Sequence, residues 1–208
     1  VRVPDSDENR AHVGPRTGGP RGLSGYPLVR LATLMALRSH ELVSARFGPY
    51  EQGEVTYAKE LWSLVPDASL VIVDRGFFSA AIFVPLARDG QRHWLTRAKK
   101  NFSWKVVKRL GKGDELVEME ISSHAHATDP SLPSGPWLMR AIRYTRKGFR
   151  PQTLLTSMVD AEKYPAQEII ELYHERWELE LGFDEVKTHM LEREEAIRSL
   201  KPTGVEQE

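Results

Sequence analysis

A tyrosine, an arginine, a glutamate and a lysine recur at spacings that place them on one face of a predicted helix. They are Tyr173, Arg176, Glu180 and Lys187. At about 100° of rotation per residue, all of them fall within a stripe roughly 60° wide. Apolar residues flank this stripe on both sides, and an arc of glutamates and histidines, including His174, lies opposite it. The polar arc should face solvent, so the stripe is expected on the packed side of the helix.

Charged groups on a packed face need partners, because desolvating an unpaired carboxylate or ammonium costs several kcal/mol or more. Metal ions and phosphates are partners that satisfy both signs of charge. An ion pair between Arg176 and Glu180 is the alternative, worth about 0.2–0.5 kcal/mol on an exposed helix. The pattern favours a functional stripe and leaves the ion pair open.

A second chemical group, Asp74, ends the apolar run SLVIVD. Such a run is typical of a strand buried on both faces of a parallel sheet. Open sheets of that type bind ligands at the carboxyl ends of their strands. A carboxylate there, with one from a helix packed across the sheet, could bind Mg²⁺. The alternative is that Asp74 only caps a helix that begins near Phe77.

The remaining elements follow from periodicity and from turn residues. Residues 1–25 are predicted to be an irregular arm, and residues 26–47 two β-like runs around the turn RSHE, the first of which could also be a buried helix. We expect a short amphipathic helix over 54–64 and another helix over 77–87. Residues 92–156 predict strands only, and a long helix opens at Pro165 and runs to about Met190. The pattern indicates an α+β fold with an α/β-like core.

Composition excludes several classes of protein. The 208 residues suit one ordinary domain or a large part of a bigger one. Because the chain has no cysteine, disulfides, cysteine-based zinc sites and a thiol nucleophile are excluded. No apolar run is long enough for a membrane helix or a signal peptide, so we expect a cytoplasmic protein.

The charges balance, with 29 basic against 29 acidic side chains, but they are unevenly distributed. Residues 88–112 and 140–150 are basic and contain aromatic residues, whereas residues 162–195 are acidic. The second basic segment comprises Arg140, Arg143, Arg146, Lys147 and Arg150, with Tyr144 and Phe149. Cations interleaved with rings suit a polyanion such as DNA. Solvated strand faces are the alternative interpretation.

Together these motifs resemble DDE transposases of the IS-four group of bacterial insertion sequences. The helix carries the Y-x2-R-x3-E-x6-K signature of that group, and DRGFF at Asp74 resembles its second-aspartate motif, D-x-G-F/Y. The start, VRVPDSDENRAHVG, and the end, RSLKPTGVEQE, also resemble segments of that group. The resemblance therefore covers essentially the whole chain.

The family implies an RNase H-like fold with a β-rich insertion between the second aspartate and the glutamate. On this basis we expect three parts. They are a partial core that carries the second catalytic aspartate (1–91), the β-rich insertion (92–160) and the core helix with the Tyr-Arg-Glu-Lys signature (161–208).

The resemblance also implies the chemistry, which is metal-dependent DNA cleavage and strand transfer by three carboxylates that hold two Mg²⁺ or Mn²⁺ ions. At the positions that match the family's motifs, Asp74 and Glu180 would be catalytic metal ligands. Tyr173, Arg176 and Lys187 would contact DNA phosphates. The partners would be double-stranded DNA, at terminal inverted repeats and at target sites in the bacterial nucleoid. Synapsis of two ends would imply a homodimer.

One departure from the family is the first catalytic aspartate, which lies on the first core strand in those enzymes. Asp5 and Asp7 lie downstream of the expected position, in a polar arm, and we do not expect either to replace it. We therefore expect a fragment that lacks the N-terminal strand and the C-terminal helix and is inactive as it stands. The alternative is a catalytically inactive remnant that at most binds DNA.

Overall fold

The computed structural model describes residues 1–15, 18–19, 22–23, 25–185 and 197–207, with side chains left undescribed from 177 to 185. The chain divides into two compact units. The first comprises Val1–Leu64 with Trp177–Glu208, and the second comprises Val65–Arg176.

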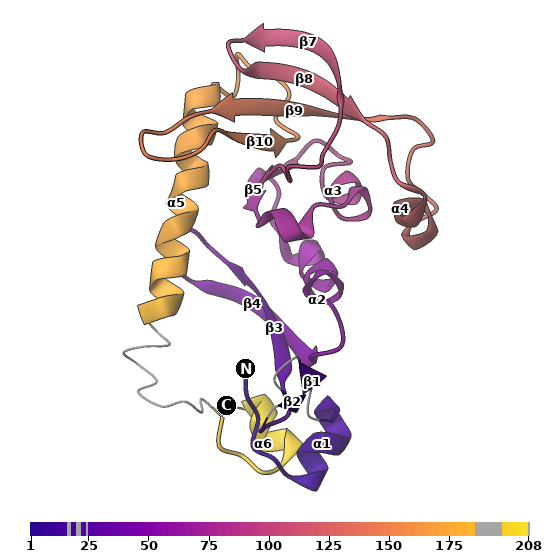
Figure 1. Ribbon diagram of the computed structural model, residues 1–208, viewed down its shortest axis with the longest axis vertical. Helices are drawn as coiled ribbons and strands as arrows, with labels where there is room; N and C mark the ends of the chain where they lie inside the picture. Colours follow the sequence, from indigo (N-terminus) through magenta and orange to yellow (C-terminus); the bar gives the residue numbers. More distant parts are fainter. Residues whose placement is uncertain (16–17, 20–21, 24, 186–196, 208) are drawn as a thin grey trace. The chain divides into compact units, whose positions relative to one another are not determined.

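The second unit is built on one mixed sheet (Figure 1). Its strands are β5 (Ser69–Ile72), β6 (Arg92–Arg97), β7 (Lys105–Gly111), β8 (Asp114–Met119), β9 (Trp137–Tyr144) and β10 (Gln152–Thr156). Their order is β5-β6-β10-β9-β8-β7, and β5 pairs with β6 in parallel while the other neighbours are antiparallel. The predicted strands are confirmed, including the parallel pairing of the SLVIVD run, but β5 is an edge strand in which only Val71 is buried, and not a strand buried on both faces.

Alternate residues of the central strands face two helical layers. On one face, Leu95 and Leu154 pack with Ile169 and Tyr173 of α5 (Ala166–Glu185). On the other face, Trp94 stacks on Phe83 of α3 (Ala80–Leu86), with ring centroids 4.5 Å apart. Because both faces are covered, the middle residues of β9 are buried whichever way they point.

A short helix, α4 (Ser123–Thr128), interrupts the segment for which the sequence predicted strands only. The Ser122 hydroxyl accepts a hydrogen bond from the Ala125 amide at 3.2 Å and so caps the helix. Ala125 is buried in a cluster with Ala80 and Ala81 of α3. A serine cap and one packed alanine thus make a helix from a polar sequence that lacks an apolar period.

The first unit contains the hairpin of β3 (Val29–Met35) and β4 (Leu42–Pro49), covered by α2 (Glu54–Leu61) and the 3₁₀ turn Trp62–Leu64. The first β-like run is therefore a strand and not a helix. The Tyr57 hydroxyl donates to the Pro49 carbonyl at 3.0 Å. A Cβ at Gly48 would lie 2.5 Å from the Tyr57 hydroxyl oxygen, so the close approach of α2 to the hairpin requires glycine there.

The expectation of an irregular arm over residues 1–25 is wrong, because α1 (Asp7–Val13) forms there. Ser6 caps this helix, and Asp7 and Glu8 in its first turn suit the helix dipole. The short strands β1 (Gly18–Gly19) and β2 (Gly22–Leu23) follow. Val13 packs with Val205 of α6 (Pro202–Gln207), so the two terminal segments pack on each other.

The mixed α/β content and the mixed sheet are consistent with the RNase H-like class. The sheet continues from β5 into β6, across the proposed boundary at residues 91 and 92. This pairing does not test the division into residues 1–91, 92–160 and 161–208, which stays a prediction. Among the described residues, no helix is both long and apolar enough to cross a membrane.

Arg140 on β9 is fully buried, which corrects its place in the basic segment assigned to a polyanion. Its Nε and Nη2 donate to the two Asp114 carboxylate oxygens at 2.7 and 2.6 Å. Its Nη1 donates to the carbonyls of Tyr164 at 2.7 Å and Met158 at 3.3 Å. The side chain therefore ties the sheet to the segment that leads into α5.

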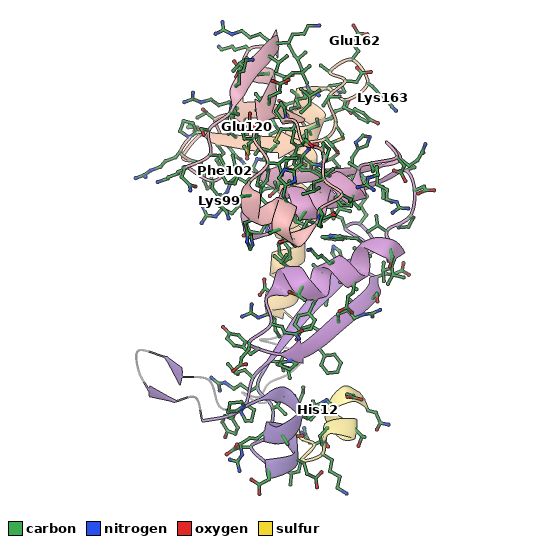
Figure 2. All side chains as sticks on the ribbon, turned by 90° about the vertical axis from the view of Figure 1, so that its right-hand side faces the viewer. His12, Lys99, Phe102, Glu120, Glu162 and Lys163 are labelled. Carbon is green, nitrogen blue, oxygen red and sulfur yellow. The ribbon has the colours of Figure 1, made fainter. Side chains whose placement is uncertain are left out.

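His93 on β6 holds the same segment. Its Nδ1 lies 3.1 Å from the Ser157 hydroxyl and its Nε2 lies 3.2 Å from the Tyr164 hydroxyl. Burial, together with the charge of Lys163, lowers the pKa of His93, so the ring is neutral near pH 7. Figure 2 shows Lys163 in this segment, where its ammonium lies 5.0 Å from the centre of the Tyr164 ring.

We predict that Arg140→Ala lowers the free energy of unfolding by about 3–5 kcal/mol, because it leaves the Asp114 carboxylate buried without its partner. Urea denaturation measures this change. Arg143→Ala, at an exposed position of the same strand, is the matched control and should cost less than about 0.5 kcal/mol. Equal losses in the two variants would contradict the structural role of Arg140.

Candidate active site

Asp74 lies where β5 ends, and its side chain is exposed. Its Oδ2 accepts a hydrogen bond from the Gly76 amide at 3.3 Å and caps the 3₁₀ turn Arg75–Phe77. The capping alternative holds only for this turn, because the helix expected from Phe77 begins at Ala80, with Ser79 in its N-cap position. A cap uses one lone pair of one oxygen, so the same carboxylate can still bind a cation.

The loop after β5 is fixed by Phe78, which lies in a cluster of aromatic rings. Its ring centroid lies 4.6 Å from that of Phe102 and 5.4 Å from that of Trp137. Phe83 and Trp94 complete the cluster, at 6.0 and 6.2 Å. The second phenylalanine of DRGFF thus anchors the loop that carries Asp74.

Tyr173 is buried, with 2% of its surface exposed, and packs on the sheet among Leu95 and Ile142. The guanidinium carbon of Arg176, one turn further along α5, lies 5.5 Å from the centre of its ring. This part of the predicted stripe therefore faces the packed side of the helix, as expected.

Burial raises the pKa of Tyr173, the positive charges of Arg176 and Arg97 lower it, and the negative charge of Asp74 raises it. Each of these charges therefore lies within electrostatic range of the Tyr173 hydroxyl. Asp74, Tyr173 and Arg176 stay a proposed set of site residues, and Arg97 joins them here although the sequence placed it only in a basic run.

Arg97 reaches this place through strand register. It ends β6, and the parallel ladder pairs Ile72 of β5 with Leu95 of β6. Asp74 and Arg97 each follow this pair by two residues along the chain, so they lie at the same end of the sheet. The parallel partner of the SLVIVD strand was the signal that could have identified this arginine.

Two more rings adjoin the site. Tyr144, at the end of β9, makes an edge contact with His174 of α5, with centroids 5.5 Å apart. His174 is half-buried, which corrects its expected place on the solvent face. Burial and the charge of Arg146 lower the pKa of His174. Burial raises the pKa of Tyr144, whereas Arg97 and Arg146 lower it. The surroundings of the two rings are thus cationic.

The other predicted ligands are only partly described. The backbone of Glu180 belongs to α5, but its side chain lies outside the described part, and Lys187 lies outside the described residues altogether. Asp5 and Asp7 both accept hydrogen bonds from Arg10. Among side chains with described positions, no three of histidine, aspartate or glutamate could hold one metal ion. The metal site therefore stays a prediction.

Comparisons with known proteins agree with these motifs. The family model described as "Transposase DDE domain" matches residues 1–208. Over 208 residues the chain is 36% identical to the transposase InsG for insertion sequence element IS4 of Escherichia coli K12, covering 100% of this chain and 46% of that protein. It is 35% identical over 107 residues to the putative transposase InsZ of the same strain, covering 51% of this chain and 36% of that protein.

We predict that Arg97→Ala raises the pKa of Tyr173 further, because it removes a positive charge that stabilises the phenolate. NMR titration with carbon-labelled tyrosine measures the shift. Arg92→Ala is the matched control on the same strand, since Arg92 pairs with Asp67 at 3.1 Å and should leave this pKa unchanged. An unchanged Tyr173 pKa in Arg97→Ala would place Arg97 outside the site.

Proposed function

We propose, on the premise that this chain belongs to the transposase DDE domain family, that it forms part of the catalytic domain of a DNA transposase. The reaction is cleavage of DNA at the ends of an insertion sequence and transfer of the released end to target DNA. The observation that carries the proposal is that the charges of Asp74, Arg97 and Arg176 all act on Tyr173, with Asp74 and Arg97 brought to the same end of the sheet by the β5–β6 register.

Asp74 fits the metal chemistry of this proposal. Its carboxylate is exposed at a strand end, and carboxylate oxygens are the ligands that Mg²⁺ and Mn²⁺ prefer. Asp74 and Glu180 would hold the divalent ions, which supply activation of water or of a DNA 3′-hydroxyl and stabilise the leaving oxygen. A third carboxylate, the first aspartate of the family motif, completes the proposed set.

The other site residues bind and orient the DNA strand. Arg97 and Arg176 each present a planar guanidinium that can hold two oxygens of one phosphate, whereas Lys187 would act as a point charge. Tyr173 is packed against the sheet, so its ring fixes the position of Arg176 above it. A rigid phosphate-binding face beside the carboxylates is what in-line attack on a phosphodiester requires.

The proposed partners are double-stranded DNA at terminal inverted repeats and at target sites, and a second copy of the protein during synapsis. The proposed location is the nucleoid in the bacterial cytoplasm. The chain spans 46% of the length of the curated relative InsG, so these assignments concern the whole protein of which such a domain is part. The alternative is a remnant that binds DNA without cutting it.

We predict that, in the whole protein that contains this domain, Glu180→Gln abolishes DNA cleavage while DNA binding is kept, because the amide removes the charge but not the volume of the ligand. The loss should exceed the 10–100-fold that removing an outer partner of a metal site costs. Nicking of a duplex with Mn²⁺ measures cleavage, and gel shift measures binding. Asp74→Asn should likewise abolish cleavage and keep DNA binding, because asparagine still caps the 3₁₀ turn.

The matched control is Glu171→Gln, which changes an exposed glutamate on the same helix and should leave cleavage unchanged. Full cleavage by Glu180→Gln would contradict the proposed mechanism. Binding without cleavage by the unaltered whole protein would favour the remnant.

A further inference from the structure

The two basic segments of the sequence differ in how their cations are paired. In the first, Arg92 pairs with Asp67 at 3.1 Å and Arg109 with Glu115 at 3.7 Å. Lys105 lies opposite Glu118 across the β7–β8 ladder. On β7, therefore, Arg109 is paired with a glutamate of β8 and Lys105 faces another.

In the second segment, Arg140 is the one cation paired with a carboxylate among the described side chains. The turn that joins β9 to β10, residues 145–151, carries Arg146, Lys147 and Arg150, all exposed. No acidic residue occurs between Asp129 and Asp160 in the sequence. Within the described part of the chain, no carboxylate pairs with any of these three cations.

The turn has a defined conformation that holds these cations outward. The Phe149 amide donates to the Arg146 carbonyl at 3.0 Å, and Gly148 takes a positive φ of 84°, which favours glycine. The guanidinium carbon of Arg146 lies 6.0 Å from the centre of the Phe149 ring. Phe149 itself is 60% exposed. An apolar ring and three cations thus share one exposed turn.

The turn also adjoins the candidate active site within the same unit. Tyr144 precedes it directly and contacts His174, whose ring centroid lies 6.4 Å from that of Tyr173. Gln152, just after the turn, accepts from the Tyr144 hydroxyl at 3.2 Å. Any strand bound at Arg176 would therefore pass close to this turn.

We propose that the β9–β10 turn, through Arg146, Lys147 and Arg150, binds the DNA backbone next to the cleavage position. The inference rests on the proposed function, since it names a further contact for the same substrate. Each cation would neutralise about one phosphate, and Phe149 would keep Arg146 in place while its exposed edge contacts deoxyribose. Such contacts position DNA without reading its sequence.

The test is the salt dependence of binding to a fluorescein-labelled duplex of arbitrary sequence, followed by anisotropy. Loss of a phosphate contact lowers the slope of log affinity against log salt by about 0.9. The combined variant Arg146→Ala, Lys147→Ala, Arg150→Ala should lower the slope by about 2–3. The matched control, Lys105→Ala, Lys108→Ala, Arg109→Ala on β7, removes the same formal charge and should lower it by less than about 1.

Equal slopes for the two variants would overturn the proposal, because they would indicate general attraction and not a located contact. An unchanged slope in the turn variant would also overturn it. Far-UV circular dichroism and urea unfolding like those of the unaltered protein exclude misfolding as the cause. Failure of the unaltered protein to bind any duplex would instead reject the proposed function itself.

Discussion

The paired burial of Arg140 and Asp114 is the interaction on which the arrangement of the second unit depends. One guanidinium joins β8, β9 and two carbonyls of the segment before α5. A buried ion pair adds little net stability relative to apolar residues of the same volume, but it tolerates few geometries. Its effect is to fix where the connection from β10 into α5 runs, and hence where α5 begins on the sheet.

The position of α5 in turn determines where its side chains lie in the candidate site. His93 holds the same connection through Ser157 and Tyr164, so two polar networks from different strands converge on it. With the start of α5 fixed, Ile169 and Tyr173 pack on the sheet and Arg176 follows one turn later. The parallel register of β5 and β6 independently brings Asp74 and Arg97 to the same edge. The candidate site thus depends both on where α5 packs on the sheet and on the register of β5 and β6.

The sequence alone predicted much of this arrangement, where local pattern and final environment agree. The apolar run before Asp74 is a parallel strand, and the helical period placed Tyr173 on the packed face. It did not predict α1 and α4, whose serine caps act on polar segments without an apolar period. Nor could it show that Arg140 is buried, because its partner Asp114 is 26 residues away and meets it only through the β8–β9 pairing.

The same distinction bears on how a chain with 29 charges of each sign would bind the DNA proposed as its partner. Net charge has little influence here, because salt screens exposed charges beyond a Debye length of about 8–10 Å at ordinary salt. At contact distance, what matters is which cations already have carboxylates beside them. Arg92, Arg109 and Arg140 are satisfied within the protein, by partners that only the fold provides. Arg146 lies on a turn whose neighbours in the sequence include no acidic residue, and its charge acts on His174, whose ring borders Tyr173. The fold, more than the composition, therefore decides where a phosphate backbone can bind.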